Sequence, residues 1–404
     1  MILNRDIKRR ILVLHNAYQF RGGEDAVVES EAKLLVQAGH SVHVEIASNE
    51  TIFGLSAKAS AFLNTPYDPA RKRWMAKLLR QTGAELVHIH NFFPLLTPAV
   101  HEAAAECGVA VVQTLHNYRL LCAGGFFLRD GHICEKCLGG NTTWGAVHRC
   151  YRGSLPGSVA VVRMQRRAHR EETWHRNVHR FIALTEFARQ KFIAGGLPAA
   201  RLVVKPNFVT EQSHPETVRS GALFVGRLSP EKGVNVLLDA WRRLPEVALT
   251  VVGEGPERTR LEAIAPPNVT FAGALPPEAV RSHMLAAQCL VLPSIWYEGF
   301  PMTIVEAFAA GLPVIASRLG SMEEIIDEGL NGLTFTAGNP AELASIVGAA
   351  FANSGTLSGM GLAARQTYDT LYTPQVNLVQ LEAIYADAIA AAKQGRAQTN
   401  IRPA

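Results

Sequence analysis

The sequence has no long apolar run, and this absence limits the kind of protein that it encodes. Its longest apolar stretches, such as GVAVVQTL at 108–115, fall far short of the roughly 20 residues that a membrane helix needs. The basic residues near the amino terminus are followed by too few apolar ones for a secretory signal. Six cysteines in 404 residues make no disulfide framework, which agrees with a reducing compartment. We therefore expect a cytoplasmic protein.

Composition and charge bound the number of domains and the partners. A chain of 404 residues with 48% hydrophobic and 19% charged residues is typical of a globular protein with two domains. Residues 1–210 contain 27 Lys and Arg against 16 Asp and Glu, whereas residues 211–404 contain 13 against 19. The first half is therefore basic, which favours an acidic partner: a phosphorylated substrate, an anionic membrane surface or a nucleic acid.

Apolar strand-like runs alternate with helical patterns along the whole chain, which predicts parallel sheets covered by helices. The order restarts after residue 220, following a polar segment at 205–221 that is typical of a linker. We predict an α/β protein with two doubly wound, Rossmann-like domains facing a central cleft, at 1–208 and 220–370. A terminal helix within 371–404 is expected to pack back on the first domain. Ligands of such sheets bind beyond the carboxyl ends of the strands, so functional residues should follow strands directly.

Two glutamates eight residues apart follow an apolar strand in PSIWYEGFPMTIVEAFAAGLPVIAS, residues 293–317. Pro301 suits the first turn of a helix, and the amides around Gly299 and Phe300 should be left for an oxygen-rich ligand. Glu306 lies among apolar residues further into this helix, where an unpaired charge is costly. Hydroxyl groups of a ligand would pair with it, although a salt bridge at the helix edge is an alternative.

A second loop, in FVGRLSPEKGVNVLLDAW at 224–241, carries Arg227 and Lys232 between a strand and a helix. Two cations beside a helix amino terminus can bind a diphosphate, although a solvated loop is the alternative. In the first half, Gly22 and Gly23 between a strand and a helix would let the backbone approach a phosphate, or simply form a tight turn. His116 ends another buried strand and would face the same cleft, although a lone histidine is more often structural.

Together these residues resemble the family 4 glycosyltransferases of GT-B fold over essentially the whole chain. The resemblance rests on RGGE (21–24), HIHN (88–91), TLHN (114–117), GRLSPEKG (226–233), VVGEGPER (251–258) and YEGFPMTIVEAFAAGLPVIAS (297–317). The last of these is similar to the family's E-x7-E element.

The resemblance implies a retaining transfer of a hexose from a nucleotide-diphosphate sugar to a saccharide or lipid-linked saccharide. Arg227 and Lys232 would bind the diphosphate, Glu306 the ribose, and Glu298 the donor sugar. His116 would line the pocket from the opposite domain. The expected donor site further includes Gly22, Gly23, Gly253, Gly299, Phe300 and Pro301. The chain contains no Asp-x-Asp, so the two cations would replace a catalytic metal ion, and no cofactor is expected for catalysis.

An insertion at about 120–152 carries Cys122, Cys134, Cys137 and Cys150. A Cys-x2-Cys with two outlying cysteines can bind a structural zinc ion tetrahedrally. Unbound thiols are one alternative. A site that uses His132 or His148 is another.

Two basic stretches, at 71–81 and 163–180, lie in the predicted first domain. In the first, Trp74 and Leu78 share a helical face among five cations, which suits an anionic membrane surface, whereas an ordinary solvated helix is the alternative. A polyprenyl-diphosphate-linked acceptor on the cytosolic face of a bacterial inner membrane would agree with the membrane interpretation. Two other functions are alternatives: a nucleotide-sugar epimerase of similar shape, and a nucleic-acid-binding protein, for which no reading helix is apparent.

Overall fold

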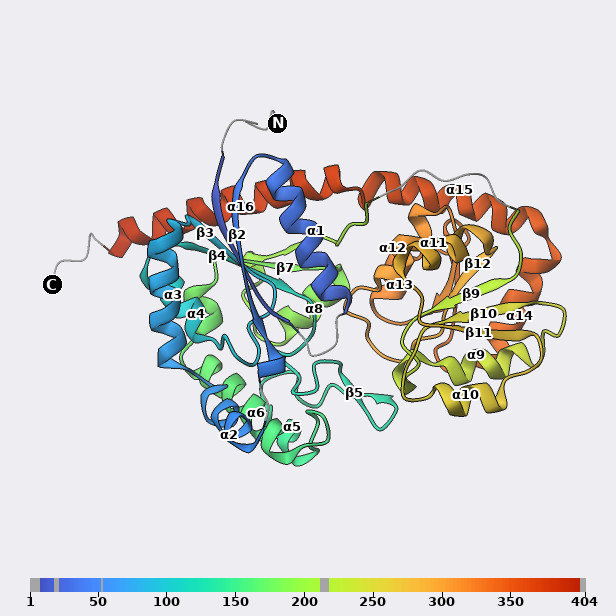
Figure 1. The fold of residues 1–404 in the computed structure, drawn as a ribbon, viewed down its shortest axis with the longest axis horizontal. Coiled ribbons are helices and arrows are strands. Elements are labelled where there is room, and N and C mark those ends of the chain that lie inside the picture. The colour runs from blue at the N-terminus through green and yellow to red at the C-terminus, as the bar shows by residue number, and fades with distance from the viewer. Residues whose placement is uncertain (1–7, 18–21, 52–53, 211–217, 400–404) are drawn as a thin grey trace. The chain divides into compact units, whose positions relative to one another are not determined.

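The computed structural model of the chain describes residues 8–17, 22–51, 54–210 and 218–399. Contacts divide it into two compact units, each with its own parallel sheet (Figure 1). Unit 1 comprises Met1–Gly125, Glu135–Lys205 and Leu378–Ala404, and unit 2 comprises Phe126–Cys134 and Pro206–Asn377. The predicted α/β class with two parallel-sheet domains is confirmed.

The sheet of unit 1 has six parallel strands in the order β2-β1-β3-β4-β7-β8. The strands are β1 (Arg10–Ala17), β2 (Ser41–Ser48), β3 (Leu86–Ile89), β4 (Ala110–Leu115), β7 (Arg180–Ala183) and β8 (Leu202–Val204). Its α-helices are α1 (Gly23–Gln37), α2 (Gly54–Asn64), α3 (Pro69–Thr82), α4 (Ala99–Glu106), α5 (Thr143–Val147), α6 (Leu155–Arg170), α7 (Thr173–Asn177), α8 (Glu186–Ala194) and most of α16 (Pro374–Thr399).

Burial explains why the sequence forms the central strands of this sheet. β1, β3 and β4 are buried along nearly their whole length, as expected for strands covered by helices on both faces. β2 is the edge strand and is largely exposed. Helix α16 packs on this unit through polar contacts, since Glu382 lies 3.1 Å from Nε2 of His40 and the Tyr385 hydroxyl lies 2.7 Å from Nδ1 of His88.

The sheet of unit 2 has six parallel strands in the order β11-β10-β9-β12-β13-β14. The strands are β9 (Ala222–Val225), β10 (Leu249–Val252), β11 (Val269–Gly273), β12 (Cys289–Leu292), β13 (Val314–Ser317) and β14 (Gly332–Phe335). Its α-helices are α9 (Val234–Trp241), α10 (Arg258–Ile264), α11 (Pro277–Ala286), α12 (Met302–Ala309), α13 (Ser321–Ile325), α14 (Pro340–Ala352) and α15 (Ser354–Leu371). Apolar side chains of β9, β12 and the flanking helices form one core on each face of the sheet.

The cysteine-rich insertion is divided between the two units, which differs from the prediction that 120–152 belongs wholly to the first domain. Its short hairpin, β5 (Leu128–Arg129) and β6 (His132–Ile133), belongs to unit 2. Aromatic contacts described below hold the hairpin there, and a local sequence pattern cannot reveal such contacts. No helix among the described residues is both long and apolar enough to cross a membrane.

Candidate functional site

The strand order of unit 2 reverses at β9, and this places the site. The chain runs outward from β9 through β10 to β11, and then returns to the other side of β9 with β12. The loops after β9 and β12 therefore begin side by side, at the carboxyl ends of two adjacent strands, before the chain continues in different directions. Ligands of open α/β sheets bind in the crevice at such a switch point. Both predicted donor-binding loops of unit 2, at 226–233 and 293–301, lie here.

Backbone contacts hold these two loops together. The amide of Ile295 donates to the carbonyl oxygen of Glu231 at 3.0 Å. Gly233 has a φ of +69°, and a Cβ added there would lie 2.0 Å from the carbonyl oxygen of Pro293. Only glycine combines this conformation with such close contact, so Gly233 fixes the neighbouring Lys232 against the second loop.

Lys232 and Glu298 form an ion pair between these loops. Nζ of Lys232 lies 2.7 Å from Oε1 of Glu298, whose side chain is 6% exposed. The Ser294 hydroxyl donates to the same oxygen at 2.7 Å, and the Ser321 hydroxyl donates to the Glu298 carbonyl oxygen at 2.7 Å. Among the described residues no group bonds to Oε2 of Glu298. A buried carboxylate is thus held in place with one oxygen left for a ligand.

Arg227 lies in the same loop after β9 as Lys232, as the sequence analysis predicts. Its side chain is exposed. Among the described residues nothing pairs with its guanidinium group. The loop therefore offers one anchored cation and one that is able to move toward an anion.

Gly253, predicted as a donor-binding residue, has a structural reason to be glycine. Its φ is +142°, and a Cβ there would lie 1.8 Å from the carbonyl oxygen of Gly226. The Gly253 amide donates to the carbonyl oxygen of Gly273 at 2.8 Å. Gly253 therefore allows the ends of β9, β10 and β11 to lie close together, and a role in donor binding stays a prediction.

The helix that follows Glu298 begins one residue later than predicted. Pro301 is the residue before α12, with an extended ψ of 93°, rather than part of the first turn. The ring of Phe300 lies edge-on to Tyr372, with centroids 6.2 Å apart, so its side chain is part of the packing. Among the described residues no group accepts from the amides of Gly299, Phe300 and Met302. The Met302 amide is one of the unpaired donors of a helix start, and the amides of Gly299 and Phe300 in the preceding loop are also left for an oxygen-rich ligand.

Glu306 lines a cavity of about 350 Å³ between α11 and α12. The side chains and backbone around it include Val225, Leu275, Val280 and Arg281. Burial raises the pKa of the Glu306 carboxyl, and the charge of Arg281 opposes this shift. Glu306 is half-buried, whereas its neighbours in the helix belong to the core. The prediction placed it on their apolar face, but the side chain instead points into a cavity of the size that small ligands occupy.

An aromatic pair that was not expected from the sequence lies beside Lys232. The rings of Phe126 and Trp296 meet edge-on with centroids 4.8 Å apart, and Nζ of Lys232 lies 5.5 Å from the centroid of Trp296. Phe127 lies edge-on to Tyr297 in the same way. These contacts attach the 126–134 hairpin to the loop that carries Glu298. The sequence signals for the hairpin are the aromatic pair Phe126 and Phe127 and the Asp130-Gly131 dipeptide at its turn.

His116 directly follows β4 in unit 1, at the carboxyl end of a buried strand, as predicted. Its side chain is half-buried, and Nε2 lies 3.0 Å from Nδ1 of His90. Burial holds the pKa of His116 well below its usual range, and the charges of His90 and His15 lower it further. The sequence analysis did not single out His90 as a functional residue, although a histidine beside an otherwise apolar strand is a usable signal.

Gly22 and Gly23 lie at the start of α1, between β1 and the helix. Gly22 has an extended backbone, with a φ of −130°, and a Cβ there would meet only Asp25 at 3.9 Å. The Asp25 carboxylate accepts from the Gly22 amide at 2.7 Å and lies 2.8 Å from Nε2 of His15. Neither conformation nor packing requires glycine at position 22.

Three of the four insertion cysteines, Cys122, Cys137 and Cys150, belong to unit 1, and Cys134 belongs to unit 2. Among the described residues one group of three or more potential ligands lies within 4.8 Å, and it is Glu31, His88 and His90. The structure thus gathers no three cysteine sulfurs in that range. The zinc site stays a prediction.

The basic helix α3 differs from the predicted membrane-facing surface. Leu78 is 8% exposed and packs in the core, so it does not share an exposed face with Trp74. The guanidinium of Arg71 lies 5.6 Å from the Trp74 ring, and Lys72 bonds to Glu106 at 2.6 Å. The prediction that Trp74 and Leu78 together form an exposed surface for a membrane is wrong, because Leu78 packs in the core and covers the sheet.

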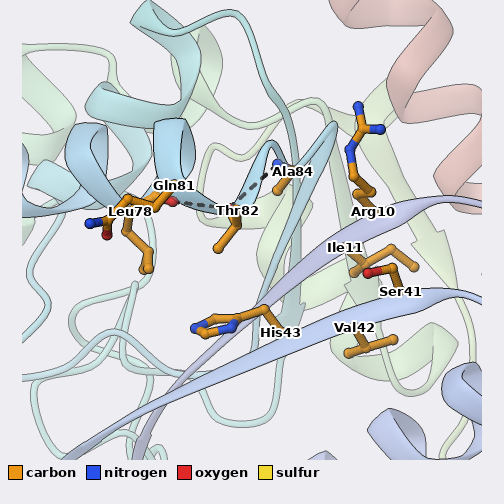
Figure 2. A pocket seen from close by; sticks show the side chains of 9 residues that line it. All are labelled: Arg10, Ile11, Ser41, Val42, His43, Leu78, Gln81, Thr82 and Ala84. Carbon is orange, nitrogen blue, oxygen red and sulfur yellow. Dashed lines mark hydrogen bonds between the residues drawn. The ribbon is translucent and has the colours of Figure 1, made fainter.

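A second cavity, of about 370 Å³, lies in unit 1 at the amino ends of β1 and β2 (Figure 2). Arg10, Ser41 and His43 line one side, and the end of α3 lines the other. The Thr82 hydroxyl there is already bonded to the carbonyl oxygen of Leu78 at 2.9 Å. This is the edge of the sheet opposite to the one where ligands of parallel sheets bind.

Comparison with known families assigns both parts of the chain. Residues 21–213 match the family described as Glycosyltransferase Family 4, and residues 219–353 match the one described as Glycosyl transferases group 1. A phosphatidyl-myo-inositol mannosyltransferase of Mycobacterium leprae is 32% identical over 194 residues, which are 45% of this chain and 52% of that protein. A GDP-mannose-dependent alpha-mannosyltransferase of Corynebacterium glutamicum is 39% identical over 110 residues, 27% of this chain and 26% of that protein. These matches span about half or less of the curated relatives.

Solved structures resemble the whole chain. HepE of Anabaena, in complex with UDP and glucose, has a TM-score of 0.63 at 20% identity, covering 93% of this chain and 99% of its own. The sucrose-phosphate synthase of Thermosynechococcus elongatus has a TM-score of 0.70 at 18% identity, covering 95% and 100%. At such identities the likeness establishes the fold, which is GT-B. Together with the two family matches, it shows that the chain belongs to the family 4 glycosyltransferases.

Proposed function

We propose that the chain transfers a hexose from a nucleotide-diphosphate sugar to a hydroxyl group of a saccharide or lipid-linked saccharide, with retention of anomeric configuration. The observation that carries this proposal is the ion pair between half-buried Lys232 and buried Glu298 at the switch point of unit 2. Its ammonium group is anchored but keeps two further N–H donors for an anion.

The departing diphosphate is the group that needs these charges. Cleavage of the bond between the anomeric carbon and the phosphate oxygen leaves negative charge on the diphosphate, which preorganised cations stabilise. Lys232 provides a fixed cation, and Arg227 in the same loop provides a bidentate donor. With both present we propose that no divalent metal is needed, so transfer should persist in a chelator.

Glu306 and its cavity suit the nucleoside part of the donor. A carboxyl whose pKa is raised by burial becomes easier to ionise when hydroxyl groups donate to it. A ribose offers two adjacent hydroxyl groups, and the apolar lining accommodates the ring of a base. The cavity therefore supports binding of a nucleoside whose ribose contacts Glu306.

The relatives suggest which donors to examine. HepE binds UDP and glucose, and the Corynebacterium relative is named for GDP-mannose. We propose a UDP-sugar or a GDP-sugar as the donor. The Mycobacterium relative is named for phosphatidyl-myo-inositol, a lipid. This name is consistent with a lipid-linked acceptor for this chain.

We propose front-face attack for the chemical step. The acceptor oxygen bonds to the anomeric carbon as the phosphate oxygen leaves, and the acceptor proton passes to that phosphate oxygen. Glu298 does not act as a nucleophile in this proposal, and its Oε1 accepts from Lys232 and Ser294. Its Oε2 instead binds hydroxyl groups of the sugar.

We also propose that the protein acts at the cytosolic face of a bacterial inner membrane, in polysaccharide or glycoconjugate synthesis. The support is the net positive charge of residues 1–210 and the lipid named in a relative. Sedimentation with anionic vesicles at low and high salt tests this part by itself.

A thermal-shift screen of UDP- and GDP-sugars tests the donor assignment. A ligand that binds only the folded state raises Tm in proportion to the logarithm of its concentration over Kd. We expect one nucleotide sugar to raise Tm in the wild type and much less in Lys232→Ala. No shift with any of them contradicts the proposal. Conversion of the donor sugar to its epimer without an acceptor would instead favour an epimerase.

A further inference from the structure

A group of polar side chains lies buried beneath His116 in unit 1, outside the donor site described above. Its centre is Glu31 of α1, which is 2% exposed. Lys205, His88 and His90 surround this carboxylate. Buried ionisable groups are costly, so an arrangement of four in one place calls for a reason.

Glu31 is the acceptor at the centre of the group. Its Oε2 lies 3.0 Å from Nζ of Lys205, and its Oε1 lies 3.1 Å from Nδ1 of His88 and 3.3 Å from Nε2 of His90. Burial alone raises the pKa of this carboxyl, but Lys205 and His88 outweigh it and hold the pKa well below its usual range. Glu31 is therefore ionised and can only accept hydrogen bonds.

The second link joins His90 to His116. Nδ1 of His90 lies 3.0 Å from Nε2 of His116, and the two rings are stacked with centroids 5.2 Å apart. β3 and β4 are parallel neighbours, and each histidine is the first residue after its strand. The sheet itself thus places the two rings side by side.

The order of these contacts fixes where the protons lie. Burial lowers the pKa of His90 to about 3, so its ring is neutral and carries one proton. Nε2 of His90 lies 3.3 Å from Oε1 of Glu31 without making a hydrogen bond to it. The negative charge of this oxygen favours the proton on Nε2, which leaves a lone pair on Nδ1. A lone pair there requires the facing Nε2 of His116 to be the donor. Neutral His116 then has its own lone pair on Nδ1.

We infer that Glu31 and His90 are positioning residues that hold His116 in the tautomer with the proton on Nε2, so that its Nδ1 accepts a hydrogen bond from a sugar hydroxyl. Among the described residues no group bonds to that nitrogen, and the His116 side chain is half-buried. His116 is thus a hydrogen-bond acceptor for substrate and not a donor. The sugar as ligand rests on the proposed function, whereas the tautomer does not.

A metal ion held by Glu31, His88 and His90 is the competing interpretation, because their ligand atoms lie within 4.8 Å of one another. Metal binding at Nε2 of His90 would move that ring's proton to Nδ1 and reverse the tautomer of His116. The ammonium group of Lys205, 3.0 Å from Glu31, opposes a cation at this place. The two interpretations therefore predict opposite protonation of one ring.

Long-range ¹H–¹⁵N correlation spectra of the full-length protein labelled with ¹⁵N-histidine distinguish the metal site from the positioning role of Glu31 and His90. The His116 signal is identified by its loss in His116→Gln. We expect a neutral His116 ring with the proton on Nε2. A proton on Nδ1, or stoichiometric metal in protein purified without a histidine tag, overturns the inference. This readout needs neither turnover nor a donor, so it stands apart from the proposed function.

Variants of His90 test the consequence for substrate. His90→Phe keeps a buried ring but removes both nitrogens, and His90→Asn keeps an amide oxygen near the position of Nδ1. We expect His90→Phe to lose the single His116 tautomer and to lower kcat/KM with UDP-glucose or GDP-mannose roughly tenfold to a hundredfold. His90→Asn should keep most of the single His116 tautomer and most of the wild-type kcat/KM.

His101→Phe is the matched control. His101 is fully buried in the same unit and lies 2.7 Å from Oε1 of Gln113, but it does not contact His116. It should leave the His116 tautomer and kcat/KM unchanged even if Tm falls. An unchanged tautomer and full kcat/KM in His90→Phe would overturn the inference.

Discussion

Nζ of Lys232 lies 2.7 Å from Oε1 of Glu298, although 66 residues separate them in the sequence. The contact joins the loop after β9 to the loop after β12 at the switch point of the unit 2 sheet. It couples the residue proposed to bind the diphosphate to the residue proposed to bind the donor sugar. The predictions below start from this pair.

Lys232→Ala should lower kcat roughly 10²- to 10³-fold, because it removes a preorganised donor from the departing diphosphate. It also leaves Glu298 buried without its cation, so Tm should fall as well. The double variant with Glu298→Gln separates the two effects, since it removes the unpaired charge. We expect the double variant to regain Tm but not kcat. Lys72→Ala, which breaks the ion pair between Lys72 on α3 and Glu106 on α4, is the control and should keep full kcat.

Glu306→Gln should stabilise the protein while weakening donor binding. Burial raises the pKa of this carboxyl above its usual 4.5, so the ionised group opposes folding once the pH exceeds that value. The gain in Tm should therefore be present at pH 7 and vanish below about pH 4, where both states are protonated. The measurement is Tm against pH, with and without a nucleotide sugar. A loss of Tm at pH 7 would mean that Glu306 serves stability instead.

Gly253→Ala should cost much more stability than Gly22→Ala. At position 253 the added Cβ would lie 1.8 Å from a carbonyl oxygen at a φ of +142°, so we expect a loss of more than about 3 kcal/mol. At position 22 neither packing nor φ opposes alanine, and the loss should stay below about 1 kcal/mol. If the Gly22 backbone approaches a phosphate, KM for the donor should still rise. Denaturant unfolding measures the loss of stability, and donor kinetics measure the change in KM. Equal losses of stability in the two variants would contradict the conclusion that the structure requires glycine at 253 but not at 22.

Phe126 and Trp296 should be energetically coupled. An edge-to-face pair contributes about 0.5–1.5 kcal/mol beyond area burial, so a double-mutant cycle with alanine at both positions should yield a coupling in that range. Proteolysis within 126–134 should be faster in either single variant, because the hairpin would lose its contact with the Glu298 loop. A coupling of zero would indicate that the hairpin is held by other contacts. Trp74→Ala on α3, where the ring packs against the guanidinium of Arg71, is the control and should leave proteolysis within 126–134 unchanged.

The regular parts of the fold follow from local patterns in the sequence. β1 is predictable because RILVLHNA contains an unbroken apolar run, and α1 because a helical pattern follows Gly22 and Gly23. β14 carries no such pattern, since only four residues form it and only two of them, Leu333 and Phe335, are apolar. Short strands of this kind depend on the sheet beside them.

The site was predictable in its residues but not in its contacts. Strand-end position and family resemblance singled out Lys232, Glu298 and His116. The Lys232–Glu298 pair and the Phe126–Trp296 pair join segments far apart in the sequence, and local patterns carry no record of such contacts. Glu31 illustrates the same limit, because a single glutamate in an amphipathic helix normally faces solvent.

The most direct test of the central claim is a crystal structure of the protein soaked with an unreactive nucleotide-sugar analogue. We predict diphosphate oxygens at hydrogen-bonding distance, about 2.7–3.2 Å, from Nζ of Lys232 and from the guanidinium of Arg227. A diphosphate bound away from both side chains would contradict the account.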